Sequence, residues 1–224
     1  MRRTFFFNVK GSPDYGSGFV VDVDGRQYFI TAAHVIQFRP TGSLTLEVMH
    51  TRAAPESVGA TIVGTELPPK ADIAVLVLDR MLIDSTPIVL EDKGAYVSEQ
   101  LYILGFPLGI LTDGSKINGD FPIPLVKGAM VAGFVTDPDG GLTGYYLDAM
   151  NNHGFSGGPV TTGGSPPRVI GVVSSYVVDR FPVVDPAGHP SGLASGNSGI
   201  MKAYSIGYAT QIIRKNPIGF KPAS

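Results

Sequence analysis

Short runs of β-branched and aromatic residues, interrupted every few positions by glycine or proline, constrain the fold of this chain more than any other feature. The 224 residues include 29 glycines and 18 prolines, which weaken or end helices but are common in turns. This pattern predicts an all-β protein with many short strands. A protein of this length forms one compact unit or two small barrels that share an interface.

The expected strands form two sets, separated at residues 91–94, where charge and glycine interrupt the apolar runs. Asp24-Gly25 predicts a two-residue hairpin turn, and one helix is expected over residues 209–215. The first set covers residues 4–9, 18–23, 27–31, 44–49, 61–64 and 73–78; the second covers 100–104, 125–135, 144–147, 158–161, 169–175 and 203–208. We therefore expect two units, residues 1–93 and 94–224.

The segment Gly154-Phe155-Ser156-Gly157-Gly158-Pro159 places a serine between glycines. Such a serine exposes its hydroxyl, and the backbone beside it frees N–H groups that can bind an oxyanion. Alone, the hexapeptide more often marks a turn. Upstream, Thr31-Ala32-Ala33-His34 offers a base and Ala71-Asp72-Ile73-Ala74 offers a carboxylate. The three segments together indicate acyl transfer by an activated serine.

A Gly-x-Ser-x-Gly pattern also marks the nucleophile of α/β-hydrolases, in which the acid and the histidine follow the serine and a helix begins directly behind it. Here residues 157–159 (Gly-Gly-Pro) would disrupt that helix. Asp179 and His189 do follow Ser156, but they lie in a Gly/Pro/Ser-rich stretch without a parallel βαβ pattern. The hydrolase interpretation is the weaker one.

Taken in the order His34, Asp72, Ser156, the sequence resembles the chymotrypsin/trypsin-like serine peptidases, and particularly their cysteine-free bacterial HtrA/Deg-like branch. Three further segments are typical of that branch: Gly16-Ser17-Gly18-Phe19, Gly105-Phe106-Pro107-Leu108-Gly109 and Ser205-Ile206-Gly207-Tyr208-Ala209. The resemblance implies two six-stranded antiparallel β-barrels of the chymotrypsin-like fold with a short C-terminal helix. One catalytic domain would use the whole length, so we expect the protease domain alone, without a PDZ module.

The resemblance also assigns roles at the site. Ser156 would be the nucleophile and His34 its general base, because a histidine accepts and returns a proton near neutral pH. Asp72 would orient the imidazole and stabilise its charged form. His34 and Asp72 would come from the first barrel and Ser156 from the second. The backbone N–H groups of Gly154 and Ser156 would form the oxyanion hole.

By the same resemblance, a group of residues would bind the substrate around the pocket for the P1 side chain, which precedes the scissile bond. These are Met150, Asn151, Asn152, His153, Val173, Ser174, Ser175, Tyr176, Ser205 and Gly207. None is acidic, so a P1 Arg or Lys would find no carboxylate, and we expect a small or medium apolar P1 residue. Backbone groups of Ser174 and Tyr176 would pair with the substrate as an added strand. Residues 177–200 are expected to form a long loop, either a lid over the substrate or a disordered insertion.

Composition limits the possible partners and cofactors. The formal net charge of -2 comes from 17 basic and 19 acidic residues, so nothing attracts nucleic acid or an anionic membrane, and the expected partner is a peptide or protein substrate. Without cysteine and with four scattered histidines, we expect neither disulfides nor a metal or other cofactor. The apolar run at residues 5–7 is too short for a signal peptide. We therefore expect a cytoplasmic protein or the mature form of an exported one.

Three functions stay open. A serine endopeptidase is the leading one, because the triad and the oxyanion glycines are complete. The second is a catalytically latent protease fold that binds peptides or acts as a sensor module. Esterase activity on small acyl esters is the third, since the same groups would perform it incidentally.

Overall fold

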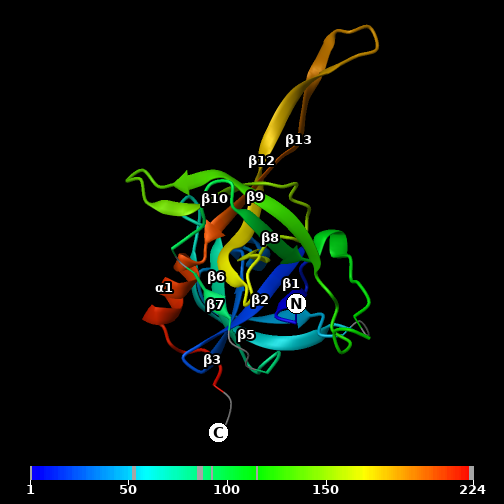
Figure 1. Ribbon diagram of the computed structural model, residues 1–224. Coiled ribbons are helices and arrows are strands. Elements are labelled where there is room, and N and C mark those ends of the chain that lie inside the picture. The colour runs from blue at the N-terminus through cyan, green and yellow to red at the C-terminus, as the bar shows by residue number, and fades with distance from the viewer. Residues whose placement is uncertain (1, 52–53, 85–87, 92, 115, 222–224) are drawn as a thin grey trace.

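The computed structural model describes residues 2–51, 54–84, 88–91, 93–114 and 116–221. Strands dominate these residues, and the helical segments are short (Figure 1). The strands are β1 (Thr4–Val9), β2 (Tyr15–Val23), β3 (Arg26–Thr31), β4 (Ser43–Val48), β5 (Glu56–Glu66), β6 (Ile73–Leu78), β7 (Val89–Leu90), β8 (Gln100–Gly105), β9 (Leu125–Thr136), β10 (Leu142–Asp148), β11 (Pro159–Thr162), β12 (Arg168–Val184) and β13 (Pro190–Ser205). The helical segments are the 3-10 turns η1 (Ala33–Ile36) and η2 (Pro107–Gly109) and the helix α1 (Gly207–Lys215). Among the described residues, no helix is long and apolar enough to cross a membrane.

The first six strands form a closed antiparallel barrel in the order β1-β2-β3-β6-β5-β4. Phe5 and Phe7 of β1 point inward, with ring centroids 6.5 Å and 5.1 Å from that of Phe29 in β3. At the hairpin between β2 and β3, Asp24 and Gly25 have φ of 51° and 70°. A two-residue type I′ turn requires positive φ at both positions, so the predicted hairpin is confirmed.

The second barrel consists of β8 to β13. These strands lie in the order β11-β8-β9-β10-β13-β12, and β11 also pairs with β12, which closes the sheet on itself. The short strand β7 adds to β12 in parallel, with Arg168 opposite Val89. The expected all-β, chymotrypsin-like fold class is therefore confirmed, and β7 is a strand that the sequence did not predict.

A hydrophobic cluster joins the two barrels. It includes Tyr28 and Ile73 from the first barrel, Val172 from the second, and Ile213 from α1. Because these buried side chains pack together, groups held by one barrel keep a fixed position relative to the other. The boundary expected at residues 91–94 falls between β6 and β8; Asp92 within it lies outside the described residues.

The structure differs from the sequence-based expectation over residues 177–200. In place of a loop, β12 and β13 continue beyond the barrel as a two-stranded ribbon, coloured yellow to orange, that projects from the body (Figure 1). Its register runs from Val178 opposite Asn197 to Val184 opposite Pro190. Much of β13 is glycine, alanine and serine, which carry little of the apolar alternation by which a strand is recognised. We call this ribbon, residues 177–200, the β-ribbon.

Candidate active site

His34 and Asp72 are brought together by strand pairing. β3 and β6 are neighbours with Thr31 opposite Ala74, so η1, which follows β3, lies beside the residue that precedes β6. The backbone N–H of His34 donates to Asp72 Oδ1 at 2.9 Å, and His34 Nδ1 lies 2.7 Å from Asp72 Oδ2. These two contacts fix both the position and the orientation of the imidazole ring.

The carboxylate of Asp72 is held in its charged form. Burial raises the pKa of Asp72, but the hydrogen bonds from His34 and Ser174 and the attraction of the imidazole outweigh burial, so the pKa lies below its ordinary value. An ionised Asp72 accepts the Nδ1–H of His34, which leaves Nε2 as the proton acceptor of the ring. This is the protonation pattern that a general base requires.

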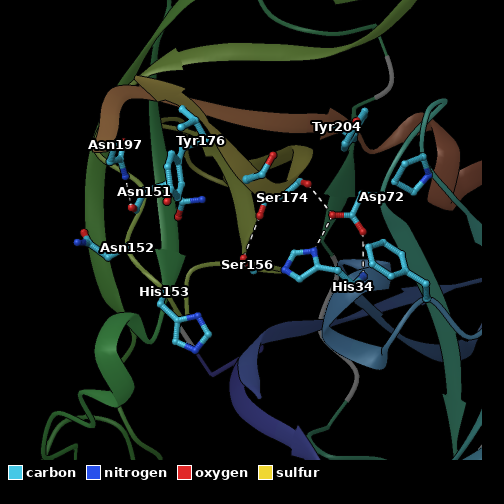
Figure 2. A pocket seen from close by; sticks show the side chains of 14 residues that line it. His34, Asp72, Asn151, Asn152, His153, Ser156, Ser174, Tyr176, Asn197 and Tyr204 are labelled. Carbon is cyan, nitrogen blue, oxygen red and sulfur yellow. Dashed lines mark hydrogen bonds and ion pairs between the residues drawn. The ribbon is translucent and has the colours of Figure 1, made fainter. Parts of the chain in front are cut away.

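Ser156, which comes from the second barrel, lines the same cleft as His34 and lies beside its imidazole ring in Figure 2. Its hydroxyl donates to the carbonyl oxygen of Ser174 at 2.9 Å. The hydroxyl of Ser174 in turn donates to Asp72 Oδ2 at 2.5 Å. Ser174 was expected only as a substrate-binding residue, and the structure shows that it also connects the serine with the carboxylate.

The loop around Ser156 turns its carbonyl oxygens away from the cleft. Each is engaged by a donor: Asn152 O by Phe155 N–H (3.1 Å), His153 O by Leu108 N–H (2.7 Å), Gly154 O by Ser17 Oγ (2.6 Å), Phe155 O by Gly158 N–H (2.8 Å) and Ser156 O by Ser17 N–H (2.8 Å). In a planar trans peptide the N–H points opposite to the C=O. With the carbonyls of His153 and Phe155 anchored, the N–H groups of Gly154 and Ser156 point the other way, and neither has an acceptor among the described residues. The backbone N–H groups of Gly154 and Ser156 are therefore two free donors beside the serine hydroxyl.

Two glycines of this loop cannot be replaced without strain. Gly154 has φ +100°, and a Cβ there would lie 2.3 Å from the carbonyl oxygen of Phe106. Gly157 has φ +83°, and its Cβ would lie 2.1 Å from the carbonyl oxygen of Ser17. Both positions combine the left-handed conformation with a close backbone approach, which only glycine accepts.

Ser17 connects the first barrel to this loop. It is fully buried in β2, and its hydroxyl donates to Gly154 O and accepts the N–H of Phe106 at 3.0 Å. Through the hydroxyl of Ser17, β2 is thus bonded to the loop of residues 152–158 and to the segment before η2. The sequence marked Gly16-Ser17-Gly18-Phe19 as a typical segment but gave no sign of these contacts.

The cleft that contains these groups has a volume of about 700 Å³. Of the residues expected at the site, it is lined by His34, Asp72, Asn151, Asn152, His153, Ser156, Ser174, Ser175 and Tyr176. Four expected substrate-binding residues lie outside this lining: Met150 is exposed, Val173 is buried in the second barrel, Ser205 is buried at the end of β13, and Gly207 begins α1. The lining also includes Phe38, Pro68, Val178, Asn197 and Tyr204, which sequence reasoning missed. For Val178 and Asn197 the reason is that the β-ribbon was expected to be a loop.

Lys127 supports the cleft wall from β9. Its ammonium donates to Asn152 Oδ1 at 3.1 Å and to the carbonyl of Met150, and it lies 5.4 Å from the centroid of the Phe155 ring. Burial lowers the pKa of Lys127. These contacts position Met150 and Asn152 at the start of the loop of residues 152–158. Within the described ranges, no three His, Cys, Asp or Glu side chains gather as a metal site.

Comparison with known proteins identifies the family and agrees with the fold. The family model of the trypsin-like peptidase domain matches residues 16–172, a range that includes His34, Asp72 and Ser156. Among solved structures, the active form of the protease Rv3671c from M. tuberculosis has a TM-score of 0.63 and 18% identity, covering 100% of this protein and 84% of that one.

Two further solved structures have the same fold. The HtrA-type protease AlgW, solved with a tripeptide, gives a TM-score of 0.62 and 18% identity, covering 96% of this protein and 60% of that one. A serine endoprotease from Yersinia pestis gives 0.58 and 16%, covering 96% and 62%. The 224 residues thus correspond to only part of these two proteins. On the match to its family model, the chain belongs to the trypsin-like peptidases, a family of serine endopeptidases.

Proposed function

We propose that this endopeptidase cleaves peptide bonds through an acyl-enzyme formed on Ser156, with His34 as general base and Asp72 as its orienting carboxylate. The observation that carries the proposal is the 2.7 Å contact between His34 Nδ1 and Asp72 Oδ2 in the cleft that also contains Ser156. The three residues belong to different elements, and two barrels hold them. Such convergence on one cleft is what a catalytic triad requires.

In the proposed reaction, Ser156 Oγ attacks the carbonyl carbon of the scissile bond while its proton passes to His34 Nε2. The N–H groups of Gly154 and Ser156 bind the oxyanion of the tetrahedral intermediate. The intermediate collapses, the C–N bond breaks, and the imidazolium donates its proton to the leaving amine. A water molecule, deprotonated by His34, then hydrolyses the acyl-enzyme and releases Ser156.

The free enzyme has to change one hydrogen bond before this reaction. The hydroxyl of Ser156 donates to Ser174 O, and attack requires it to donate to His34 Nε2 instead. A substrate that pairs with β12 as an added strand would offer its own backbone N–H to Ser174 O. Substrate binding would then displace the serine hydroxyl from that carbonyl at the step where it is needed.

The P1 preference is proposed to be a small or medium apolar residue. Within the described lining of the cleft, Asp72 is the one carboxylate, and His34 and Ser174 already engage it. A P1 Arg or Lys would therefore be desolvated without a partner. Cleavage of a peptide library mainly after Arg or Lys would contradict this preference.

The triad is tested by labelling with a fluorophosphonate, which reacts with an activated serine whatever the natural substrate. We expect labelling of the wild type, loss of labelling in Ser156→Ala and His34→Ala, and labelling close to wild type in Ser175→Ala, which removes a different hydroxyl from the same cleft. Absence of labelling in a folded wild type would instead favour the catalytically latent, peptide-binding module.

A further inference from the structure

β12 is one continuous strand with two different environments. Up to Val173 it lies inside the second barrel, paired with β11 on one side and β13 on the other. Beyond Val173, β13 is its one partner among the described residues. Apart from the hydroxyl of Ser156, which donates to Ser174 O, no backbone group of the described residues pairs with the other edge of β12 from Ser174 to Val184.

The open edge begins inside the active-site cleft. Ser174, Ser175, Tyr176 and Val178 line the cleft together with His34 and Ser156, and so does Asn197, which lies opposite Val178 on β13. Asn197 Nδ2 also donates to the carbonyl of Asn151 in the cleft wall. Figure 2 shows Tyr176, Asn151 and Asn197 grouped above Ser156. The base of the β-ribbon is thus part of the cleft, and the β-ribbon continues the same strand outward.

The side chains of the outer part of β12 are suited to contact an apolar, extended segment. Val178, Phe181 and Val184 are 52%, 46% and 57% exposed, although β-branched and aromatic residues gain free energy by burial. A two-stranded ribbon is marginally stable in water, and a third strand adds both backbone hydrogen bonds and packing. An open strand edge with exposed apolar side chains is the template on which an extended peptide adds.

The direction of the substrate follows from the position of His34. The imidazole must protonate the leaving amine, so the substrate residues after the scissile bond lie toward the first barrel, which holds His34. The substrate residues before the scissile bond then lie over the second barrel, along β12. Since paired strands advance in step, residues farther from the scissile bond meet residues farther out on the β-ribbon.

We propose that the open edge of β12 from Val177 to Val184 is an extended subsite. It binds the substrate segment that begins about four residues before the scissile bond, as a third strand of the β-ribbon. This inference rests on the proposed function, because Ser156 sets the position of the scissile bond. The substrate class that it implies is an unfolded polypeptide with a β-prone, apolar stretch upstream of the cleavage point, in preference to a short peptide.

The pairing of β12 with β13 suggests a deletion variant that removes the proposed subsite and keeps the active-site cleft intact. Deleting residues 180–195 joins Asp179 directly to Gly196, which already lie opposite each other, next to the pair Val178 and Asn197. Asp-Gly is a favoured two-residue hairpin turn, so the shortened β-ribbon should close without strain. Phe181→Ser on β12 is a milder variant, and its matched control is Leu193→Ser on β13, which removes an exposed apolar side chain from the other strand.

Binding is measured by fluorescence anisotropy in a Ser156→Ala background, so that the result does not depend on catalysis. The first probe is a short peptide that contains a Val–Ser bond, with Val at P1, and has four residues before that bond. The second probe is the same peptide with six further N-terminal residues, alternately Val and Thr. We expect the longer peptide to bind at least about tenfold more tightly. The deletion should abolish this difference, Phe181→Ser should reduce it, and Leu193→Ser should leave it unchanged, while the short peptide binds all variants alike.

Equal affinity for the two peptides would overturn the proposal, and so would a gain from a C-terminal extension instead of an N-terminal one. A deletion that weakens both peptides equally would show that the β-ribbon shapes the cleft and does not bind substrate. If the deletion changes the molar mass in light scattering and the preference for the longer peptide stays, the β-ribbon is a contact between copies and the proposal is wrong. Fluorophosphonate labelling reports the triad separately, so failure of the subsite and failure of the proposed function are distinguishable.

Discussion

Asp72 stands in a buried position where a charge would be costly if it were not paired. Donors from two barrels compensate for that cost: the N–H and Nδ1 of His34 on one side and the hydroxyl of Ser174 on the other. The same three hydrogen bonds that keep the pKa of Asp72 low also hold the imidazole in the orientation of a general base. The charge of Asp72 and the orientation of the imidazole therefore depend on the same hydrogen bonds.

The lowered pKa predicts how Asp72 contributes to stability as pH changes. A carboxylate whose folded-state pKa is depressed stabilises the fold above its unfolded pKa, about 3.9, and loses this contribution as pH falls through the lower folded-state pKa. In urea unfolding, the difference in free energy between the wild type and Asp72→Asn should be constant from pH 7 to about 5 and shrink below about 4. A difference that grows as the pH falls would contradict the assignment.

We also expect Asp72→Asn to lower kcat by about four orders of magnitude, as in the general serine-protease template.

At the level of elements, β2, the loop of residues 152–158 and the segment before η2 meet at one residue, Ser17. Ser17 gives its N–H to Ser156 O and its hydroxyl to Gly154 O, and it accepts the N–H of Phe106. The first barrel therefore takes part in shaping the loop that carries the proposed oxyanion donors, the N–H groups of Gly154 and Ser156. The N–H groups of Gly154 and Ser156 point away from these partners because the carbonyls beside them are already bonded.

This connection predicts a selective defect in Ser17→Ala. The variant leaves Gly154 O and the N–H of Phe106 unpaired in a buried place, which should cost about 1–3 kcal/mol of stability. In the proposed mechanism the N–H groups of Gly154 and Ser156 act in the transition state, so kcat should fall about ten- to a hundredfold with little change in KM. Thr143→Val is the matched control, since Thr143 is also buried and donates to a carbonyl, that of Val135 at 3.0 Å, away from the cleft. If both variants lost stability and neither lost kcat, Ser17 would be structural only.

The strands of both barrels could be predicted because apolar alternation and turn residues mark them locally. Asp24-Gly25 and the runs that became β1, β3 and β6 are examples. The β-ribbon could not be predicted in this way: Gly192, Gly196 and Gly199 interrupt β13, and its strand character depends on pairing with β12. The contacts of Ser17 were equally hidden, because its partners lie 89 and 137 residues away in sequence. Sequence patterns record local preference, whereas these two features are set by tertiary pairing.

At the scale of the whole molecule, the two barrels supply different residues of the site. The first barrel holds His34 and Asp72, and the second holds Ser156 and the loop of residues 152–158. The cluster around Tyr28, Ile73, Val172 and Ile213 fixes one barrel against the other. A cleft between two rigid bodies places groups from distant parts of the sequence within reach of one substrate. In the proposed mechanism, the hydroxyl of Ser156 exchanges Ser174 O for His34 Nε2 before it attacks the substrate.

The joint action of His34 and Ser156 is tested most directly with a valyl peptide chloromethyl ketone, a reagent that alkylates an imidazole once a neighbouring serine has added to its ketone. Peptide mapping by mass spectrometry should find the adduct on His34 in the wild type and no adduct in Ser156→Ala. His153 lines the same cleft and serves as the internal control, which should stay unmodified. Modification of His153 in place of His34, or equal modification of His34 with and without Ser156, would contradict the claim that the two barrels bring this histidine and this serine to one reacting carbonyl.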